Sequence, residues 1–371
     1  MAVNIAMIGV GAISGIYLEN ITKTFGGLRL LGVCDLIRER ASAAQEKYQV
    51  PKLYETMEEA FADPEVDIVL NLTRPYEHFE VTKAALLAGK HVYSEKPLGI
   101  TFEEGRALYD LAKEKGLLLG GAPDTFMGAG IQTCRKLIDD GVIGDVIGSA
   151  AFMICHGHET WHPDPEFYYK RGGGPMMDMG PYYITALINL VGGVKAVSGV
   201  TRATFPQRVI TSEPHRGEII DVDVPTYVTG TLHYENGAIG TIFTTFDVYY
   251  PTQARLEIYG TKGTLIAPDP NYFDGPVSVF SPADGAVKEV PLLFGYRENS
   301  RAMGLADMAD ALENGRDFRP NSDQQLHVLE ILTAFEKSSD AGHAIEMTTA
   351  YRRGEPMLRD NIPGHVAGLG R

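Results

Sequence analysis

The chain has 371 residues, of which 44% are hydrophobic and 22% are charged. This length allows about two or three globular domains, and this composition argues against wholesale disorder. Lys and Arg number 33 against 48 Asp and Glu, which gives a formal charge of −15. Because so negative a surface repels phosphate backbones and anionic lipids, we expect no nucleic-acid partner and no membrane partner.

The cysteines and the apolar runs indicate the cellular setting. Cys34, Cys134 and Cys155 lie far apart and form no C-x-x-C pair, which excludes a disulfide scaffold and a four-cysteine zinc site. The first residues lack a basic segment followed by a long apolar run, and no stretch reaches the roughly 18 apolar residues of a membrane-spanning helix. We therefore expect a cytoplasmic protein.

The first third of the chain alternates short apolar runs with segments of helical spacing. The predicted strands are Val3–Ile8, Leu30–Cys34, Asp67–Leu72, His91–Ser94 and Leu117–Gly120, and the predicted helices are Ala12–Thr24, Ile37–Tyr48, Tyr76–Ala88 and a helix from Thr101, where Glu104 completes a capping box, to Gly116. This alternation predicts a parallel, doubly wound sheet of the Rossmann type. Right-handed crossovers put its ligand crevice at the carboxyl ends of the strands.

From about Asp145 the pattern becomes rich in strands joined by tight turns. The predicted strands are Val146–Cys155, Ala196–Phe205, Tyr227–Tyr234, Ala238–Tyr249 and Ala254–Tyr259, followed by helices near Ser300–Glu313 and Ser322–Ser338. We therefore predict a nucleotide-binding α/β domain over residues 1–123 and a substrate-binding and oligomerisation α+β domain over 124–371, which contains a large, open, mostly antiparallel sheet. A second subunit would cover one face of that sheet, because a broad face is costly to leave in water.

The first chemical motif is Gly9-Val10-Gly11-Ala12-Ile13-Ser14, directly after a predicted strand and at the start of a helix. Gly9 would allow the tight turn, Gly11 would let a pyrophosphate approach the backbone, and the helix N-terminus would supply N–H groups. The alternative is an ordinary tight turn between a strand and a helix. What favours a dinucleotide site is Asp35, which ends the second strand twenty residues after Gly15.

Asp35 also indicates which dinucleotide is bound. Its carboxylate can accept hydrogen bonds from both adenosine ribose hydroxyls and repels a 2′-phosphate, so we predict NAD rather than NADP. Arg38, three residues on, could instead pair with a 2′-phosphate. We interpret Arg38 as an exposed helix arginine beside Glu39.

The second motif is Ser94-Glu95-Lys96-Pro97 at the end of the fourth predicted strand, which places Lys96 in the expected crevice. An ammonium there needs water or a partner. It could hold a substrate hydroxyl and lower the pKa of a neighbouring acid. The alternative is a surface lysine at the start of a loop.

The third motif, Cys155–Pro165, contains three histidines and the single tryptophan of the chain. A zinc site of His156, His158 and His162 is disfavoured, because the spacing is loose and no acidic or cysteine ligand is placed with them, so we expect no metal. We predict that His156, His158 and Trp161 form a polar and aromatic substrate wall, with an irregular surface loop as the alternative. Asp124, after the fifth strand, is a further candidate for the rim of the cofactor or substrate site.

These motifs resemble those of the Gfo/Idh/MocA oxidoreductases, a family that includes glucose–fructose oxidoreductase and inositol dehydrogenase. The resemblance extends to three further segments: Thr73 to His78, Gly89-Lys90-His91-Val92 and the glycine-rich Gly172–Tyr182. The resemblance covers essentially the whole chain. It implies that the pyrophosphate of the cofactor binds at Gly9, Gly11, Ala12 and Ile13 and that the adenosine ribose binds at Asp35. It also implies that Thr73, Arg74 and Pro75 line the edge of the cofactor site, with His78 beneath them. Glu95 and Lys96 would lie near the nicotinamide ribose. It also implies an active site of Lys96, Asp178 and Tyr182. Many members have His at the position of Tyr182 and Pro at that of Arg74.

A tyrosine can serve the reaction that the resemblance implies. Oxidation of an alcohol needs a base for the hydroxyl proton, and the pKa of a free tyrosine, about 10, makes it a poor one. A nearby cation lowers that pKa, and Lys96 would be the cation while Asp178 orients a substrate hydroxyl or Lys96 itself. The alternative is that Tyr182 and Tyr183 are core aromatics. Whether Lys96 or Tyr182 takes the proton stays open.

The sequence thus predicts an NAD-dependent dehydrogenase that transfers hydride between a secondary hydroxyl or ketone of a sugar, inositol or glycoside and the nicotinamide. One alternative is an NAD-dependent glycosidase that works by transient oxidation and elimination. The other is a non-catalytic NAD and sugar sensor, because a fold alone does not establish activity. We expect a homodimer or homotetramer formed through the open sheet.

Overall fold

The computed structural model describes residues 2–249 and 255–357 and divides them into two compact units. The first unit contains residues 2–128, 294–326 and 354–357, and the second contains the remaining described residues. These units do not coincide with the two predicted domains, residues 1–123 and 124–371, because the late helix α9 (Met303–Asn314) belongs to the first unit. There the Gly304 amide donates to the carboxylate of Asp124 over 3.0 Å. The boundary at residues 326 and 327 falls inside helix α10 (Ser322–Ala341).

The first unit contains a six-stranded parallel sheet with the strand order β3-β2-β1-β4-β5-β6, which confirms the predicted doubly wound sheet. Its strands are β1 (Val3–Ile8), β2 (Leu28–Cys34), β3 (Lys52–Leu53), β4 (Ile68–Asn71), β5 (His91–Ser94) and β6 (Leu119–Gly121). All four residues of β4 are buried, as parallel strands covered on both faces require. The order reverses between β1 and β4, and this is where ligands bind in such sheets.

Helices connect successive strands of this sheet. They are α1 (Ser14–Lys23), α2 (Arg38–Tyr48), α3 (Met57–Ala62), α4 (His78–Leu87) and α5 (Phe102–Lys115), followed by the 3₁₀ helix η1 (Thr125–Met127). Right-handed crossovers place α1 and α2 on one face and α4 and α5 on the other. Thr101 caps α5 as predicted, since its hydroxyl accepts from the Glu104 amide over 3.2 Å, but the Glu104 carboxylate accepts from the Ile100 amide and not from that of Thr101. The sequence analysis did not predict α3 or β3, which are short.

The second unit contains a nine-stranded sheet with the order β16-β15-β14-β13-β7-β12-β11-β8-β17. Its strands are β7 (Val146–Ile154), β8 (Val194–Arg202), β11 (Tyr227–Tyr234), β12 (Ile239–Thr245), β13 (Arg255–Gly260), β14 (Thr264–Ala267), β15 (Val277–Ser281), β16 (Ala286–Val290) and β17 (Ile345–Glu346). Among these described strands only β7 and β12 pair in parallel, so the sheet is mostly antiparallel, as predicted. Ala254, with which one predicted strand begins, lies outside the described residues.

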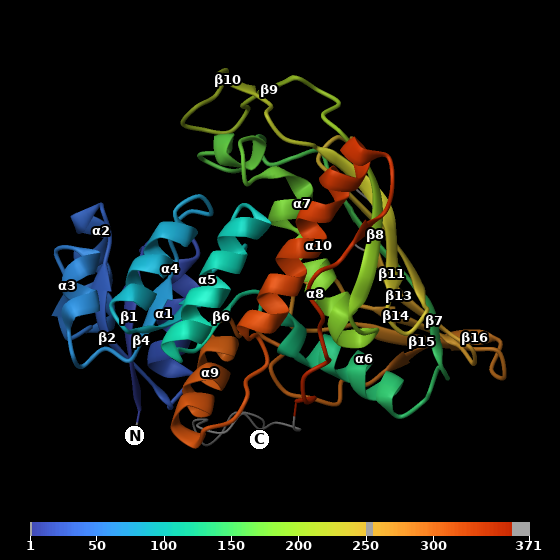
Figure 1. The fold of residues 1–371 in the computed structure, drawn as a ribbon, viewed down its shortest axis with the longest axis horizontal. Helices are drawn as coiled ribbons and strands as arrows, with labels where there is room; N and C mark the ends of the chain where they lie inside the picture. The colour runs from blue at the N-terminus through green and yellow to red at the C-terminus, as the bar shows by residue number, and fades with distance from the viewer. Residues whose placement is uncertain (1, 250–254, 358–371) are drawn as a thin grey trace. The chain divides into compact units, whose positions relative to one another are not determined.

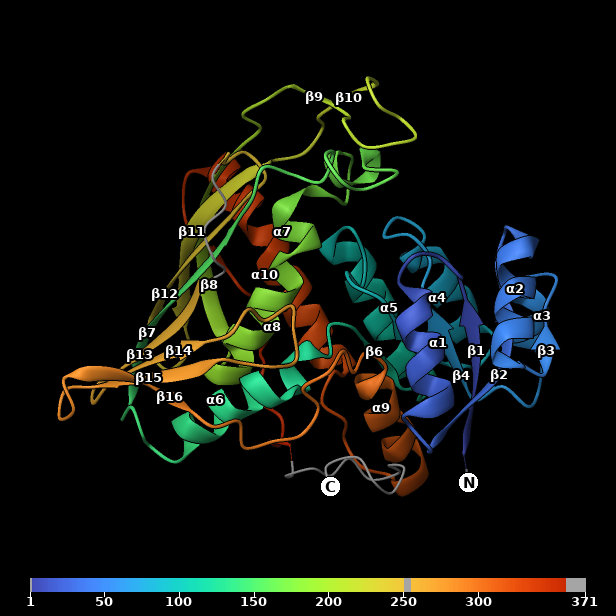
Figure 2. The ribbon, with the colours of Figure 1, turned by 180° about the vertical axis from the view of Figure 1, so that it is seen from behind.

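Helices of the second unit lie on one face of this sheet, as Figures 1 and 2 both show. They are α6 (Ala129–Asp139), α7 (Gly174–Asp178), α8 (Gly180–Leu190) and the greater part of α10, with the 3₁₀ helix η2 (Glu166–Tyr169) nearby in sequence. Gly199 and Gly230 pair across β8 and β11, and a Cβ on either would lie within 3.0 Å of Phe335 in α10. The absence of side chains at this pair lets α10 lie directly on the sheet.

The other face carries a row of side chains over which neither view draws a helix. The row is set by the strand register, because the residues next to Gly199 and Gly230 point away from α10. It runs across five strands through Arg255, Phe152, Phe243, Thr229 and Val200. The Phe152 and Phe243 rings lie 6.4 Å apart, and Val200 is 67% exposed.

Two further strands, β9 (Gln207–Val209) and β10 (Ile219–Asp221), form a separate antiparallel ribbon in the second unit. Arg208, the middle residue of β9, points inward and is 4% exposed, whereas its neighbour Val209 is 55% exposed. Within the described part of the chain, no helix has the length and apolarity needed to cross a membrane.

Candidate functional site

The glycine-rich loop after β1 passes directly over the end of β4. Gly9 has a φ of +96°, and a Cβ there would lie 2.8 Å from the backbone carbon and oxygen of Leu72. Only glycine therefore fits at this crossing of two loops.

The N-terminus of α1, which follows this loop, is open. No side chain caps it at Ile13, Gly11 and Ala12 are exposed, and a Cβ on Gly11 would meet nothing within 4 Å. The Ser14 hydroxyl turns back and donates to the Gly11 carbonyl over 2.8 Å. A helix N-terminus that no side chain caps and the open space beside Gly11 fit the pyrophosphate of a dinucleotide.

Asp35 follows β2 and fixes the shape of this loop. Its carboxylate accepts from the Val10 amide over 2.6 Å and from the Ile37 amide over 2.7 Å. Each carboxylate oxygen has a second lone pair, so Asp35 can also accept from ribose hydroxyls. Arg38, considered above as a partner for a 2′-phosphate, forms an exposed ion pair with Glu55. The described residues therefore fit NAD.

A buried asparagine organises the loop after β4. The Asn71 side chain accepts from the Thr73 amide and hydroxyl over 3.2 and 2.7 Å, and it donates to the His78 carbonyl and the Thr82 hydroxyl. The imidazole of His78 is itself buried, with Nδ1 2.8 Å from the Pro97 carbonyl and Nε2 3.0 Å from the Thr73 carbonyl. His78 thus joins the loops after β4 and β5, and burial lowers its pKa.

The two other predicted residues of this loop lie nearer the surface. Arg74 is exposed and donates to the Tyr76 hydroxyl over 2.8 Å, while Pro75 is half-buried.

A buried carboxylate holds the backbone at Lys96. Glu95 is 8% exposed, and its oxygens accept from the Tyr17 hydroxyl over 2.8 Å and from the Lys96 amide over 3.0 Å. Burial and the nearby Glu95 raise the pKa of Tyr17 well above its ordinary value. Lys96 itself is half-buried at the end of β5, where the sequence analysis placed it.

Asp124, predicted for the rim of the site, is 1% exposed and does not face solvent. It accepts from Gly304 at the start of α9, and burial raises its pKa to about 6. Its observed contact is therefore with the polypeptide of the first unit.

In the second unit, Asp178 and Tyr182 lie on either side of the junction between α7 and α8. The turns continue through this junction, since the Met179 amide donates to the Pro175 carbonyl and the Tyr182 amide donates to that of Met179. Residues four apart on such a path lie on the same face. This spacing predicts that Asp178, which is half-buried, and Tyr182, which is 8% exposed, project from the same side of the two helices.

The loop after β7 brings His158 to Asp178. His158 Nε2 lies 3.2 Å from Asp178 Oδ2, and their side chains are 14% and 17% exposed. Trp161 Nε1 donates to His158 Nδ1 over 3.2 Å, although the indole is 61% exposed. His156 instead stacks on Tyr249, with ring centroids 3.7 Å apart. His158 and Trp161 are therefore linked to Asp178 by hydrogen bonds, whereas His156 packs against Tyr249.

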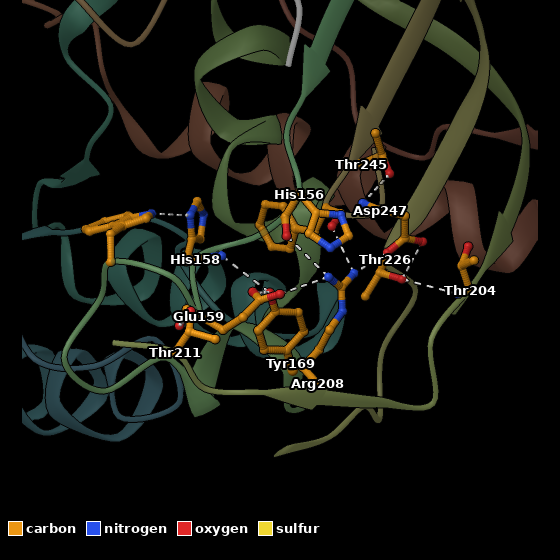
Figure 3. A network of polar contacts seen from close by, with 12 residues as sticks. His156, His158, Glu159, Tyr169, Thr204, Arg208, Thr211, Thr226, Thr245 and Asp247 are labelled. Carbon is orange, nitrogen blue, oxygen red and sulfur yellow. Dashed lines mark hydrogen bonds and ion pairs between the residues drawn. The ribbon is translucent and has the colours of Figure 1, made fainter. Parts of the chain in front are cut away.

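A buried guanidinium holds this loop from below, as Figure 3 shows. Arg208 donates to the His156 carbonyl over 3.2 Å and to Glu159 Oε1 over 2.9 Å, and its other end bonds to Asp247 and the Phe246 carbonyl. The Arg208, Glu159 and Asp247 side chains are all at most 6% exposed. The described residues contain no group of three or more His, Cys, Asp or Glu placed to hold a metal.

Sequence reasoning missed several of these supporting residues. Asn71 had a usable signal, because a polar residue inside an apolar parallel strand needs partners. Tyr17 and Arg208 had none, because the partner of Tyr17 lies 78 residues away along the chain and those of Arg208 lie 38–52 residues away.

Comparison with known proteins gives matches to both halves of the chain. A family model described as oxidoreductase family, NAD-binding Rossmann fold, matches residues 3–121, and one described as GFO/IDH/MocA C-terminal domain matches residues 131–266. An uncharacterized oxidoreductase of Schizosaccharomyces pombe is 26% identical over 349 residues, 84% of this chain and 90% of that protein. The scyllo-inositol 2-dehydrogenase (NAD(+)) of Bacillus subtilis is 23% identical over 360 residues, 96% of each chain.

Among solved structures, levoglucosan dehydrogenase in complex with NADH and levoglucosan has a TM-score of 0.80 to this structure at 23% identity. The alignment covers 93% of this chain and 99% of that one. At this identity the likeness establishes the fold.

The buried carboxyl of Asp124 predicts a specific pH dependence of stability. Its pKa of about 6 in the folded state exceeds the ordinary unfolded value of about 3.9, so the folded state binds the proton more tightly. Stability from this group is complete below about pH 4 and is lost as the pH rises through 6. Asp124→Asn retains an acceptor for Gly304 and removes the titration. Its unfolding free energy, measured with urea, should gain about 2–3 kcal/mol on wild type between pH 4 and 7. Parallel curves for the two proteins would contradict this assignment.

Proposed function

Because the chain belongs to the Gfo/Idh/MocA family of oxidoreductases, we propose that it transfers hydride between NAD and a secondary hydroxyl or ketone of a sugar, inositol or glycoside. The observation that carries the proposal is the open N-terminus of α1 beside the carboxylate of Asp35, at the point where the strand order reverses. This arrangement suits a dinucleotide without a 2′-phosphate.

Three side chains are assigned to the chemistry: Lys96, Asp178 and Tyr182. Bound NAD would supply the hydride acceptor. As hydride leaves the carbon, the hydroxyl proton must pass to a base, and Tyr182 and Lys96 are the two candidates for that acceptor. The carboxylate of Asp178 would accept a hydrogen bond from a substrate hydroxyl and so orient the ring.

A carbohydrate or polyol is supported by the character of the loop after β7. The indole of Trp161 is 61% exposed, and such a face suits the C–H face of a sugar ring. Two similar proteins described above are named for an inositol and for levoglucosan. The three cysteines are free, which suits a reducing compartment such as the cytoplasm.

We further propose that the protein forms a homodimer or homotetramer through the large sheet. The row through Phe152, Phe243 and Val200 lies on the face opposite α10 and includes a half-buried aromatic pair. A face of this breadth and composition is typical of a surface that a second subunit covers.

Substitutions at the two candidate bases test the reaction. Tyr182→Phe should retain NADH binding, measured by fluorescence titration, and lower turnover by about 100-fold or more. Lys96→Arg retains the cation but cannot accept a proton. If Tyr182 is the base and Lys96 only supplies charge, Lys96→Arg should keep turnover within about tenfold of wild type; if Lys96 is the base, Lys96→Arg should lower turnover by about 100-fold or more. NADH formation would be followed with a panel of aldoses, inositols, levoglucosan and methyl glucosides.

Two outcomes of this panel would contradict the proposal. Release of an aglycone without net NADH would indicate a glycosidase. Ligand binding without turnover in wild type and in both variants would indicate a sensor.

Cofactor preference gives a separate prediction. Asp35→Ser replaces the carboxylate that accepts from the Val10 and Ile37 amides, and that would accept from the ribose hydroxyls, with a shorter, neutral hydroxyl, and so removes the charge that repels a 2′-phosphate. The ratio of NADH to NADPH affinity should fall by about tenfold or more, because hydrogen bonds to charged groups are strong. Arg38→Ala is the matched control, and it should leave the ratio nearly unchanged. A larger effect at Arg38 than at Asp35 would show that the protein is built for NADP.

A further inference from the structure

We propose that His158 is a positioning residue: a neutral imidazole with its proton on Nε2 that holds the carboxylate of Asp178, in a tautomer selected by Trp161. The inference rests on the proposed function, which assigns Asp178 a part in the reaction. In this role His158 holds the carboxylate of Asp178; it neither accepts a proton in the reaction nor binds a substrate hydroxyl directly.

The tautomer follows from the chemistry of the indole. Trp161 Nε1 carries a hydrogen and has no acceptor capacity, and it lies 3.2 Å from His158 Nδ1. Nδ1 must therefore present a lone pair, and a neutral ring then carries its hydrogen on Nε2. A proton on Nδ1 would place two N–H donors against each other.

The second contact agrees with this assignment. His158 Nε2 faces Asp178 Oδ2 at 3.2 Å, and an ionised carboxylate only accepts hydrogen bonds. The indole thus donates to the imidazole, and the imidazole donates to the carboxylate. Both bonds run in one direction and require the same tautomer.

Packing prevents the ring from turning over. Aromatic rings of Trp161, Tyr168 and Phe246 surround His158, with centroid distances of 5.3, 4.3 and 4.6 Å. A half-turn about the bond to the ring would exchange nitrogen for carbon at both contacts and lose both hydrogen bonds. The side chain is 14% exposed, so water has little access to replace them.

The backbone on both sides of His158 is fixed by Arg208, as Figure 3 shows. One guanidinium nitrogen donates to the His156 carbonyl and to the carboxylate of Glu159, the residues before and after the Gly157–His158 pair. The His158 amide donates to the Tyr169 hydroxyl over 3.3 Å, and that hydroxyl donates to Glu159. The imidazole therefore projects from a rigid segment.

The consequence is that both ring nitrogens of His158 already have partners. The ring acts on the reaction through Asp178, whose Oδ2 it holds in place. Loss of that bond should affect turnover more than the affinity for NADH.

Nuclear magnetic resonance of the ring nitrogens tests the tautomer without any turnover. In protein labelled with ¹⁵N at histidine, at pH 8 and without substrate, His158 should show an unprotonated Nδ1 and a protonated Nε2, with His158→Gln identifying its signals. Asp178→Asn should leave this pattern unchanged, because the indole of Trp161 alone demands it. A proton on Nδ1 in wild type, or a change of tautomer in Asp178→Asn, would overturn the proposal.

Kinetics with two substitutions test the role. A glutamine amide can accept from Trp161 and donate to Asp178, as the proposed tautomer does, whereas leucine can do neither. His158→Leu should lower kcat by roughly 10- to 150-fold, the equivalent of one hydrogen bond to a charged group, with NADH binding retained. His158→Gln should restore most of that loss.

Equal inactivity of the Gln and Leu variants would show that His158 carries a proton in the reaction and would overturn the positioning role. Absence of turnover in wild type would instead contradict the proposed function and leave the tautomer measurement intact.

Discussion

The backbone at Gly9 passes so close to Leu72 that no side chain fits between them, and the arrangement of the first unit's site depends on this crossing. It brings the ends of β1 and β4 together where the strand order reverses. The chain then enters α1 with no side chain capping the helix N-terminus, and Asp35 holds the loop through the Val10 amide. One steric constraint thus produces both the opening for a pyrophosphate and the position of the acidic residue beside it.

In both units, residues assigned to chemistry are held by buried polar groups. Glu95 fixes the backbone at Lys96, and Arg208 fixes the loop that carries His158. Buried charges contribute little net stability, because desolvation offsets their attraction. These buried groups instead fix geometry, because a buried hydrogen bond with no other partner available holds the bonded atoms at one distance and angle. Asp124 is a similar case. Its hydrogen bond from Gly304 holds the start of α9, but burial makes the ionised form of its carboxyl group unfavourable.

The sequence predicted the features that depend on local pattern. The glycine-rich loop, Asp35, the strand that ends two residues before Lys96 and the helix cap at Thr101 each involve residues close in the chain or a regular alternation. It did not predict that residues 294–326 belong to the first unit, because their contact with Asp124 spans 180 residues. Nor did it find Arg208, whose partners come from two distant loops. The histidine-rich loop was predicted as a substrate wall, and only coordinates show that both nitrogens of His158 are already bonded.

We propose that hydride passes directly from a carbon of the substrate to the nicotinamide. The most direct measurement uses whichever member of the panel is oxidised fastest, with deuterium at the oxidised carbon, and analyses the reduced cofactor by mass spectrometry and NMR. Deuterium should appear at C4 of the nicotinamide, and kcat/KM should show a normal primary isotope effect. Deuterium that stays in the sugar product or is lost to water, with no labelled NADH at any time, would contradict it.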